Sequence, residues 1–244
     1  MAKIIAMIPV RLGSKRIKSK NLRLINGKPL ISYILEATIN ANKKYKLFDD
    51  IYINSEADIF NKIADEYGVK FYKRPEFLSE DHIRNDDYAY DFIESHECDI
   101  LVQLLATSPF ISPEDIYHFI KEMIKGKYET MKTITNICIE CTLDGKPINY
   151  NQFEKTILSQ HIEPVQQNVG AIMGWDCNKF IQNMKKYNAA YNGGDGTVGF
   201  YEIKGFSVVD IDYEYDFLLA ETIIEYLKNS KDSVKQYYTY DNKL

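Results

Sequence analysis

The first half of the chain alternates short apolar runs with segments whose apolar residues recur at helical spacing. Strand-length apolar runs occupy residues 3–9, 50–54, 69–72 and 99–105. Apolar positions three and four apart predict helices around residues 30–38, 59–67, 88–93 and 116–123. The alternation predicts an α/β fold with a mainly parallel sheet flanked by helices.

Two helix boundaries have specific signals. Ser112 stands where an N-cap is expected, Pro113 occupies the first helical position, and two acids follow it. Gly68 follows the apolar positions of residues 59–67, and a glycine there favours the end of a helix. Both signals support the alternation of strands and helices.

The regular alternation of predicted strands and helices is lost between about residues 131 and 205. Residues 131–140 and 168–175 predict strands, and residues 188–199 form a loop with four glycines. We interpret about 131–205 as an inserted β-rich lobe for substrate or dimer contacts, within a single domain that spans residues 1–244. Residues 205–217 predict a return to strand, and a final helix carries Phe217, Ala220, Ile224 and Leu227 on one side.

Charge and hydropathy exclude some classes of protein. The chain has 30 Lys and Arg against 35 Asp and Glu, a net charge of −5, which argues against a nucleic-acid-binding face. No apolar run approaches the roughly 20 residues of a membrane span. The first ten residues lack the long apolar region and cleavage site of a signal peptide, so we expect a cytoplasmic location.

The four cysteines are Cys98, Cys138, Cys141 and Cys177. Cys138 and Cys141 form a C-x-x-C pair, which invites a zinc or redox hypothesis. No second pair follows at zinc spacing. We therefore expect buried or half-buried thiols rather than a metal or redox site.

Five positive charges follow the first predicted strand within ten positions: Arg11, Lys15, Arg16, Lys18 and Lys20. Ligands of parallel sheets bind beyond the carboxyl ends of the strands, where this loop lies. Gly13 lets backbone amides approach a ligand, and the cations suit phosphates. Neither the P-loop spacing nor the dinucleotide fingerprint is present. The loop alone therefore leaves a phosphate site and a solvated basic loop as alternatives.

Two further polar clusters follow predicted strands. Asp210 and Asp212 alternate along the predicted late strand, so both carboxylates would point to one side and could hold a divalent cation. Thr107 and Ser108 follow the fourth strand and could contact a base or ribose, or only start a turn. Three polar clusters at strand ends favour one shared site.

These segments together resemble the acylneuraminate cytidylyltransferases, which make CMP-sialic acids and related CMP-nonulosonates. The family opening, A-R-x-G-S-K-x-x-x-x-K-N, is matched by "VRLGSKRIKSKN" at Arg11, Gly13, Ser14, Lys15, Lys20 and Asn21. "RPEFLSED" matches R-P-x-x-L-x-x-D through Arg74 and Asp81, "LLATSPF" resembles Q-P-T-S-P-L-R, and "DIDYEYDF" matches D-I-D-x-x-x-D. The resemblance is close over residues 1–125 and looser over 158–227, and it implies a fold like that of nucleotide-diphospho-sugar transferases.

The resemblance implies a reaction in which an acidic sugar hydroxyl attacks the α-phosphorus of CTP and pyrophosphate leaves. It implies catalytic roles for Arg11, Lys15, Lys20 and Asp212, and nucleotide contacts from Arg11, Gly13, Ser14, Lys15, Lys20, Asn21, Arg74, Asp81, Thr107 and Ser108. It also implies Mg²⁺ on Asp210 and Asp212, and Mn²⁺ is expected to substitute. The general base is not identified: an aspartate, a metal-bound water or the substrate carboxylate could serve.

The resemblance further implies a homodimer built through the inserted lobe. Aromatic residues suit an interface core, and the lobe has several: Trp175, Phe180, Tyr187 and Tyr191. The alternative is that these side chains fill the core of the lobe itself.

The segments that the resemblance assigns to sugar binding depart from the family pattern. Relatives carry a segment like R-R-Q-D-L-P-P-V followed by N-G-A-I, and here the stretch reads "LSQHIEPVQQNVGAI". Gln160, Gly170 and Ala171 match and are expected to bind substrate, whereas Leu158 and Ser159 replace the paired arginines. Val169, Leu105 and Ile111 replace an asparagine, a glutamine and an arginine of the pattern.

We therefore expect N-acetylneuraminic acid to be a poor substrate, because arginine forks suit carboxylates. A modified nonulosonate or another acidic acceptor should be preferred. His161 and Glu163 are candidates for contacting its substituents; alternatively they are surface residues of a loop.

Three alternative functions stay open. Cytidylyltransferases for the eight-carbon acid KDO open with A-R-x-x-S-T-R-x-x-G-K, which this chain does not match. The acceptor could be another acidic hydroxyl compound. The chain could also be a catalytically silent nucleotide-binding relative, although retention of Arg11, Lys15, Asp210 and Asp212 argues against silence.

Overall fold

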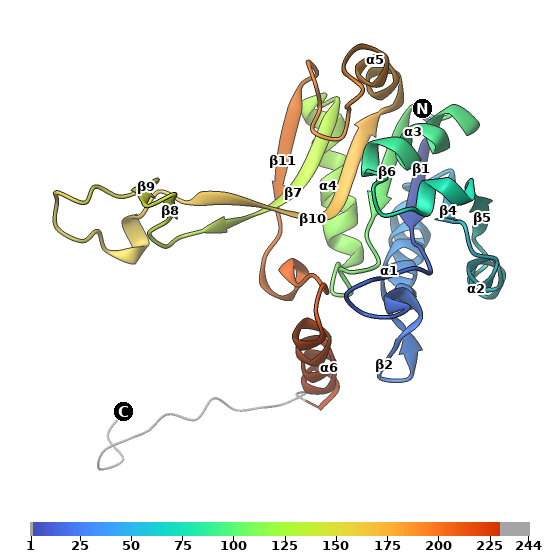
Figure 1. Ribbon diagram of the computed structural model, residues 1–244, viewed down its shortest axis with the longest axis horizontal. Coiled ribbons are helices and arrows are strands. Elements are labelled where there is room, and N and C mark those ends of the chain that lie inside the picture. The colour runs from blue at the N-terminus through green and yellow to red at the C-terminus, as the bar shows by residue number, and fades with distance from the viewer. Residues whose placement is uncertain (1, 230–244) are drawn as a thin grey trace.

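The fold is built on a seven-stranded sheet, which the computed structural model shows within its described residues, 2–229 (Figure 1). The strand order is β11-β7-β10-β6-β1-β4-β5. Strand β10 runs antiparallel to β6 and β7, and all other neighbours run parallel. The strands are β1 (Ile4–Pro9), β4 (Asp50–Ser55), β5 (Lys70–Lys73), β6 (Ile100–Leu104), β7 (Thr130–Ile137), β10 (Val165–Asp176) and β11 (Val198–Glu202). The predicted mainly parallel α/β class is confirmed.

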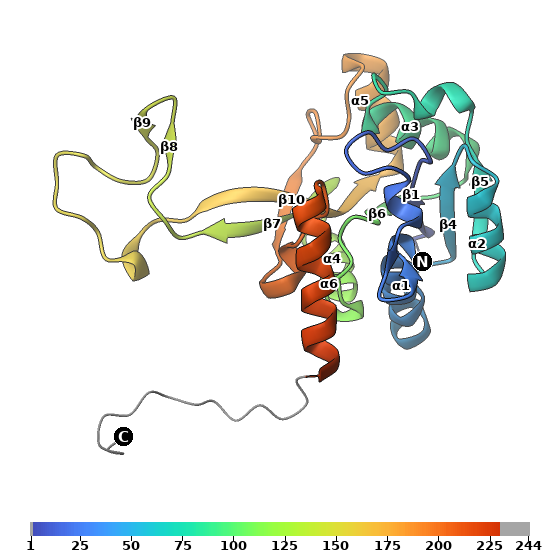
Figure 2. The ribbon, with the colours of Figure 1, turned by 60° about the horizontal axis from the view of Figure 1, so that its bottom comes forward.

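Helices cover both faces of the sheet, as Figures 1 and 2 show. One face carries α1 (Leu30–Tyr45), α2 (Ile59–Tyr67) and α4 (Pro113–Gly126), and the other carries α3 (Asn85–Ser95) and α5 (Cys177–Tyr187). Helix α6 (Glu214–Asn229) packs beside the small β2–β3 hairpin (Leu24–Ile25 and Lys28–Pro29). The remaining short elements are η1 (Lys20–Leu22), η2 (Glu76–Ser79), η3 (Ser159–His161), η4 (Gly205–Val208), β8 (Thr142–Leu143) and β9 (Lys146–Pro147).

Strand β1 is apolar throughout because it is covered on both sides. Ile4, Ala6 and Ile8 belong to the core under α1, α2 and α4, whereas Ile5 and Met7 belong to the core under α3 and α5. A central strand of a parallel sheet therefore reads as a continuous apolar run, which is why the sequence predicted it.

Both predicted helix boundaries are confirmed. The Ser112 hydroxyl accepts a hydrogen bond from the backbone amide of Asp115 at 3.0 Å, and the Asp115 carboxylate accepts one from the Ser112 amide at 3.0 Å. Gly68 ends α2 with φ of 65°, in the left-handed region that glycine adopts without strain.

The predicted lobe of residues 131–205 is not confirmed, because β7, β10 and β11 join the main sheet. Residues 138–164, here called the arm, extend away from it and include the β8–β9 hairpin, and the loop after β9 reaches furthest from the sheet (Figures 1 and 2). Strand β10 is long enough to pair within the main sheet and also to extend toward the arm. Its second half pairs with β6 and β7, and its first half continues with β7 toward the arm.

The strand predicted within residues 205–217 is wrong. This segment forms the η4 turn, an extended stretch and the start of α6. Ile211 is buried and its amide donates to the Thr107 carbonyl oxygen at 2.9 Å, which ties the stretch to the end of β6. The late strand is instead β11, which begins within the last two residues of the predicted glycine-rich loop.

The predicted interface role of the aromatic residues is wrong for Trp175 and Phe180. Both are buried in this chain's own core beneath α3 and α5, with ring centroids 5.4 Å apart. Tyr191 is half-buried beside Trp175, and Tyr187 is exposed.

Cys177 is buried and Cys98 half-buried, as expected, and their sulfur atoms lie 2.8 Å apart. Cys141 is also half-buried, but Cys138 is exposed, contrary to expectation, since it lies where β7 leaves the sheet for the arm. No helix within residues 2–229 is long and apolar enough to cross a membrane.

Candidate active site

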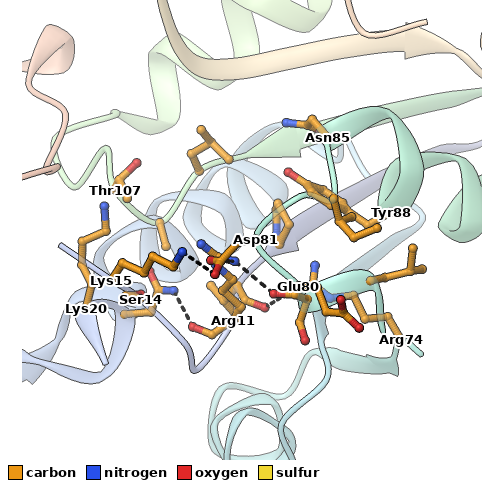
Figure 3. Close-up of a pocket in the computed structure, with 18 of the residues that line it drawn as sticks. Arg11, Ser14, Lys15, Lys20, Arg74, Glu80, Asp81, Asn85, Tyr88 and Thr107 are labelled. Atoms are coloured by element: carbon orange, nitrogen blue, oxygen red, sulfur yellow. Dashed lines mark hydrogen bonds and ion pairs between the residues drawn. The ribbon is translucent and has the colours of Figure 1, made fainter. Parts of the chain in front are cut away.

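A cleft of about 570 Å³ opens at the carboxyl ends of β1, β5 and β6 (Figure 3). Parallel strands place the loops that follow them at one edge of the sheet, so segments far apart in the sequence meet there. The volume lies within the range of small-molecule sites. Its basic lining residues are Arg11, Lys15, Arg16, Lys20 and Arg74.

The basic loop is held in place by backbone contacts. The buried Asn21 donates from Nδ2 to the Arg11 carbonyl oxygen at 3.3 Å, which closes the loop across its base. The Leu12 amide donates to Glu56 Oε1 at 2.8 Å. The loop is therefore fixed at both the strand end and the helix end, while four of its five cationic side chains, all but Lys18, line the cleft.

Arg11 and Lys15 share one carboxylate across the cleft (Figure 3). Asp81 lies 2.6 Å from the Lys15 ammonium and 3.2 Å from the Arg11 guanidinium. These contacts, that with Lys15 first, lower the pKa of Asp81 below its ordinary value. Asp81 is therefore ionised at neutral pH and holds both cations where an anionic ligand could reach them.

Arg74 forms the floor of the cleft and is only 3% exposed. Its Nη2 donates to the Val10 carbonyl oxygen at 2.9 Å and to Glu56 Oε2 at 3.2 Å. Burial lowers the pKa of Arg74, and the charge of Glu56 partly offsets that effect. Its Nε is buried without a partner in the described chain, so it can still donate to a ligand.

Two lining residues of the cleft contact the segment before α6, although the predicted metal ligands Asp210 and Asp212 do not line the cleft themselves. Lys20 Nζ donates to the Ile211 carbonyl oxygen and to Asp212 Oδ1, the latter at 3.3 Å. Arg16 approaches the other oxygen of Asp212 at 2.7 Å. The backbone amides of residues 212 and 213 donate to Asp216, which fixes this segment at the first turn of the helix.

Asp210 differs from Asp212 in its electrostatic surroundings. Desolvation by the surrounding protein raises the pKa of Asp210 although part of the side chain is solvent-accessible, and the nearby charge of Asp212 raises it further. A contact with the Thr107 hydroxyl acts in the opposite direction.

The two aspartates do not share a strand, contrary to the sequence prediction, but they flank the buried Ile211 and remain close enough to interact. Within residues 2–229, no group of three or more His, Cys, Asp and Glu side chains could hold a metal ion. Mg²⁺ beside a phosphate commonly uses only one or two carboxylates, so the residues present fit a metal completed by a ligand's phosphates.

Most predicted nucleotide contacts meet in the cleft. Its lining includes Arg11, Ser14, Lys15, Lys20, Asn21, Arg74, Asp81 and Thr107. Gly13 lies in the basic loop but does not line the cleft. Ser108 is buried behind the turn, with a hydroxyl that has no partner in the described chain.

The predicted substrate-binding residues lie in two places, on the arm and beside the cleft. Gln160 and His161 are exposed on the arm and do not line this chain's cleft. The prediction failed for them because a sequence match does not show that these residues leave the sheet. Glu163 is also exposed on the arm. Gly170 and Ala171 lie beside the cleft, where the Ala171 carbonyl oxygen accepts from the Leu105 amide at 3.0 Å.

Sequence reasoning missed three residues that shape the site. Glu56 anchors the basic loop, as described above. Asn85 and Tyr88, from the first turn of α3, line the far end of the cleft (Figure 3), and the Asn85 side-chain oxygen is buried without a partner in the described chain. No motif marked them, because their positions follow from the packing of α3.

Comparison with known sequences identifies related proteins. The family profile described as "Cytidylyltransferase" matches residues 5–164. The N-acylneuraminate cytidylyltransferase of Escherichia coli O18:K1:H7 is 28% identical over 251 residues, which cover 99% of this chain but 56% of that protein. The chain thus spans little more than half of that relative. The CMP-N,N'-diacetyllegionaminic acid synthase of Legionella pneumophila is 25% identical over 91% of this chain and 97% of its own length.

Solved structures share the fold at lower identity. A CMP:2-keto-3-deoxy-manno-octonic acid synthetase complexed with CTP aligns over 92% of this chain and 99% of its own, with a TM-score of 0.68 and 17% identity. A 4-diphosphocytidyl-2C-methyl-D-erythritol synthase from Anaerococcus prevotii covers the same shares, with a TM-score of 0.64 and 14% identity.

Replacing Arg74 with Met should destabilise the protein by about 3 kcal/mol or more, because the Glu56 carboxylate would stay buried without its cation. Urea unfolding of the purified protein measures the change. The matched control is Lys73→Met, which removes an exposed ion pair with Asp58 and should cost less than about 1 kcal/mol. Equal losses for the two variants would contradict a special role of the buried pair.

Proposed function

Because this chain belongs to the cytidylyltransferase family, whose profile matches residues 5–164, we propose that it transfers CMP from CTP to an acidic, nonulosonate-like sugar and releases pyrophosphate. The observation that carries the proposal is the cleft itself. Five basic side chains line it at the carboxyl ends of parallel strands, in a protein whose net charge is −5. Such a local concentration of cations suits a polyphosphate.

The cations have distinct roles in this proposal. Arg11 and Lys15 would exchange their contact with Asp81 for contacts with the triphosphate. Lys20, held by the carbonyl of Ile211, would face the phosphates from the opposite side. Fixed cations that neutralise charge on the departing pyrophosphate stabilise the transition state without rearrangement.

Asp210 and Asp212 would hold Mg²⁺ together with phosphate oxygens. When bound, the ion would polarise the phosphoryl group and draw charge from the transferring oxygens. Asp212 is already poised between Arg16 and Lys20, so its charge is balanced before any ligand enters.

The acceptor is proposed as an acidic sugar because the two relatives named above act on N-acylneuraminate and on N,N'-diacetyllegionaminic acid, by their names. The sequence departures favour a modified nonulosonate over N-acetylneuraminic acid. Ile111, at a position where the family pattern has arginine, is buried in the core and offers no charge to a carboxylate.

We also propose a homodimer formed through the arm. Its exposed large apolar side chains are Ile139, Leu143, Ile148, Phe153 and Leu158, and Phe153 is 88% exposed. A projecting segment with this much apolar surface suits an interface. In such a dimer Gln160 and His161 could reach the cleft of the partner subunit, since they do not line the cleft of their own chain.

The function is tested by pyrophosphate release from CTP with a panel of ulosonic acids. We expect release with at least one acid, and a kcat/KM for N-acetylneuraminic acid below that of the preferred acid by tenfold or more. Arg11→Ala or Lys15→Ala should lower turnover about 100-fold, because each removes a fixed cation from the transition state. Lys18→Ala is the matched control, since Lys18 lies in the same loop, is exposed and does not line the cleft.

No release with any acid would overturn the function and favour a silent nucleotide-binding relative. Near-full activity of Arg11→Ala or Lys15→Ala would show that the site is misplaced. A tenfold preference for N-acetylneuraminic acid would overturn the acceptor prediction alone.

The metal role predicts that EDTA abolishes turnover and that Mg²⁺ or Mn²⁺ restores it. Asp212→Asn should make activity nearly undetectable at millimolar Mg²⁺, because it removes half of the carboxylate pair. Asp195→Asn, at an exposed position outside the cleft, should leave turnover unchanged. Turnover that is insensitive to chelation would contradict this role of the two aspartates.

The dimer is tested by light scattering at micromolar concentration, which should give twice the mass of the chain. Phe153→Asp should shift the protein toward monomer, because it places a charge in the apolar contact of the arm. Lys155→Asp, exposed on the same arm, should leave the dimer intact. A monomeric wild-type protein would contradict the proposal.

A further inference from the structure

Lys132, on β7, is a buried lysine whose side chain has no acidic partner in the described part of the chain. It is only 7% exposed. Its ammonium donates to Asn192 Oδ1 and lies 5.5 Å from the centre of the Tyr191 ring. Burial lowers the pKa of Lys132, and no carboxylate within residues 2–229 offsets that effect. A buried cation without a counter-ion is costly, so its presence needs an explanation.

Gln103, on β6, is a second buried polar group without partners. It is fully buried, and neither its Nε2 nor its Oε1 has a hydrogen-bond partner among the described residues. Met173 of β10 pairs with Gln103 on one side and with Lys132 on the other. The three residues therefore form one row across the sheet, and their side chains lie on the same face.

This row lies behind the residues at one end of the cleft, and neither Lys132 nor Gln103 lines the cleft itself. Gln103 precedes the cleft residue Leu105 by two positions, so their side chains leave the chain on the same side of the sheet. The residues that cover the row are tied to the cleft wall. Asp86 Oδ1, from the first turn of α3, accepts hydrogen bonds from the amides of Ala190 at 2.6 Å and Tyr191 at 2.8 Å.

The first turn of α3 also supplies Asn85 and Tyr88 to the far end of the cleft. Asn85 Oδ1 is buried and has no partner in the described chain. A cation, two amide groups and the rim of the cleft therefore meet on one face. Ammonium and amide N–H groups are donors, and together they suit a carboxylate.

We propose that Lys132, assisted by the Gln103 amide, binds the carboxylate of the acidic acceptor just beyond the end of the cleft opposite the basic loop, where a bound acceptor would have to reach behind the residues that line the cleft. The inference rests on the proposed function. It assigns recognition of the acceptor's carboxylate to residues that the family motifs do not include. The arginines that the sequence pattern places at residues 158 and 159 are absent here, so a cation from the sheet would replace them.

The test measures kinetics of Lys132→Met with saturating CTP and the preferred acid from the panel. The KM for the acid should rise at least tenfold, because one charged contact is lost, while the KM for CTP should change less than twofold. Lys132→Arg should retain most of the affinity because it keeps the charge. Lys125→Met, an exposed lysine on α4, is the control and should match wild type.

A matched acceptor separates a carboxylate contact from a general packing effect. The carboxamide of the same acid should bind weakly to wild type, and Lys132→Met should weaken it no further. If Lys132→Met weakens acid and carboxamide equally, Lys132 does not contact the carboxylate and the inference is overturned.

Gln103→Leu gives an independent test. It removes a buried amide that lacks partners, so the midpoint of urea unfolding should stay unchanged or rise, while the KM for the acid should increase. A lower unfolding midpoint with an unchanged KM would show a purely structural role and overturn the part assigned to Gln103.

Failure of this inference differs from failure of the proposed function. Wild-type protein that releases pyrophosphate with an acid, together with Lys132→Met that keeps the wild-type KM for it, overturns the inference alone. Wild-type protein that releases none with any acid overturns both.

Discussion

The active-site cleft depends on one buried contact between Glu56 and Arg74. The two carboxylate oxygens of Glu56 bind different partners: one accepts from the Leu12 amide, and the other accepts from Arg74, which also donates to the Val10 carbonyl. These residues follow β4, β1 and β5. A single ion pair thus ties three parallel strand ends together and sets where the basic loop can lie. Its burial makes it sensitive to loss of either partner.

The cations above this floor are balanced by exposed carboxylates. Asp81 pairs with Arg11 and Lys15, and Asp212 pairs with Arg16 and Lys20. Exposed pairs contribute little to stability, so exchanging them for a polyphosphate costs little. The same pairs keep the cations ordered before a ligand arrives. Charge balance and preorganisation are therefore provided by the same two aspartates, from segments more than a hundred residues apart in the sequence.

The sequence predicted the first half of the fold well because each element there buries its residues with a regular period. Strand β11 was missed because its glycine is needed for packing: a Cβ on Gly199 would lie 2.4 Å from the Tyr128 ring. A glycine selected by close packing looks like a loop signal in the sequence.

The site was predictable only in part. Charges in the basic loop could be recognised, since their positions follow one strand directly. Asn85 and Tyr88 could not, because both reach the cleft only through the tertiary packing of α3. Asp210 and Asp212 were placed on a strand that does not exist, yet they lie close together because the buried Ile211 fixes the chain between them.

The arm has a consequence for how such proteins can diverge. Ile137 and Val165 are paired at its base, so the 27 residues 138–164 form a closed loop whose ends are already held by the sheet. Each doubling of a loop's length costs only about 0.6 kcal/mol of closure entropy. Insertions, deletions and new side chains in the arm therefore cost the sheet little. The arm can therefore change in length and sequence over evolutionary time while the sheet and the cleft stay as they are.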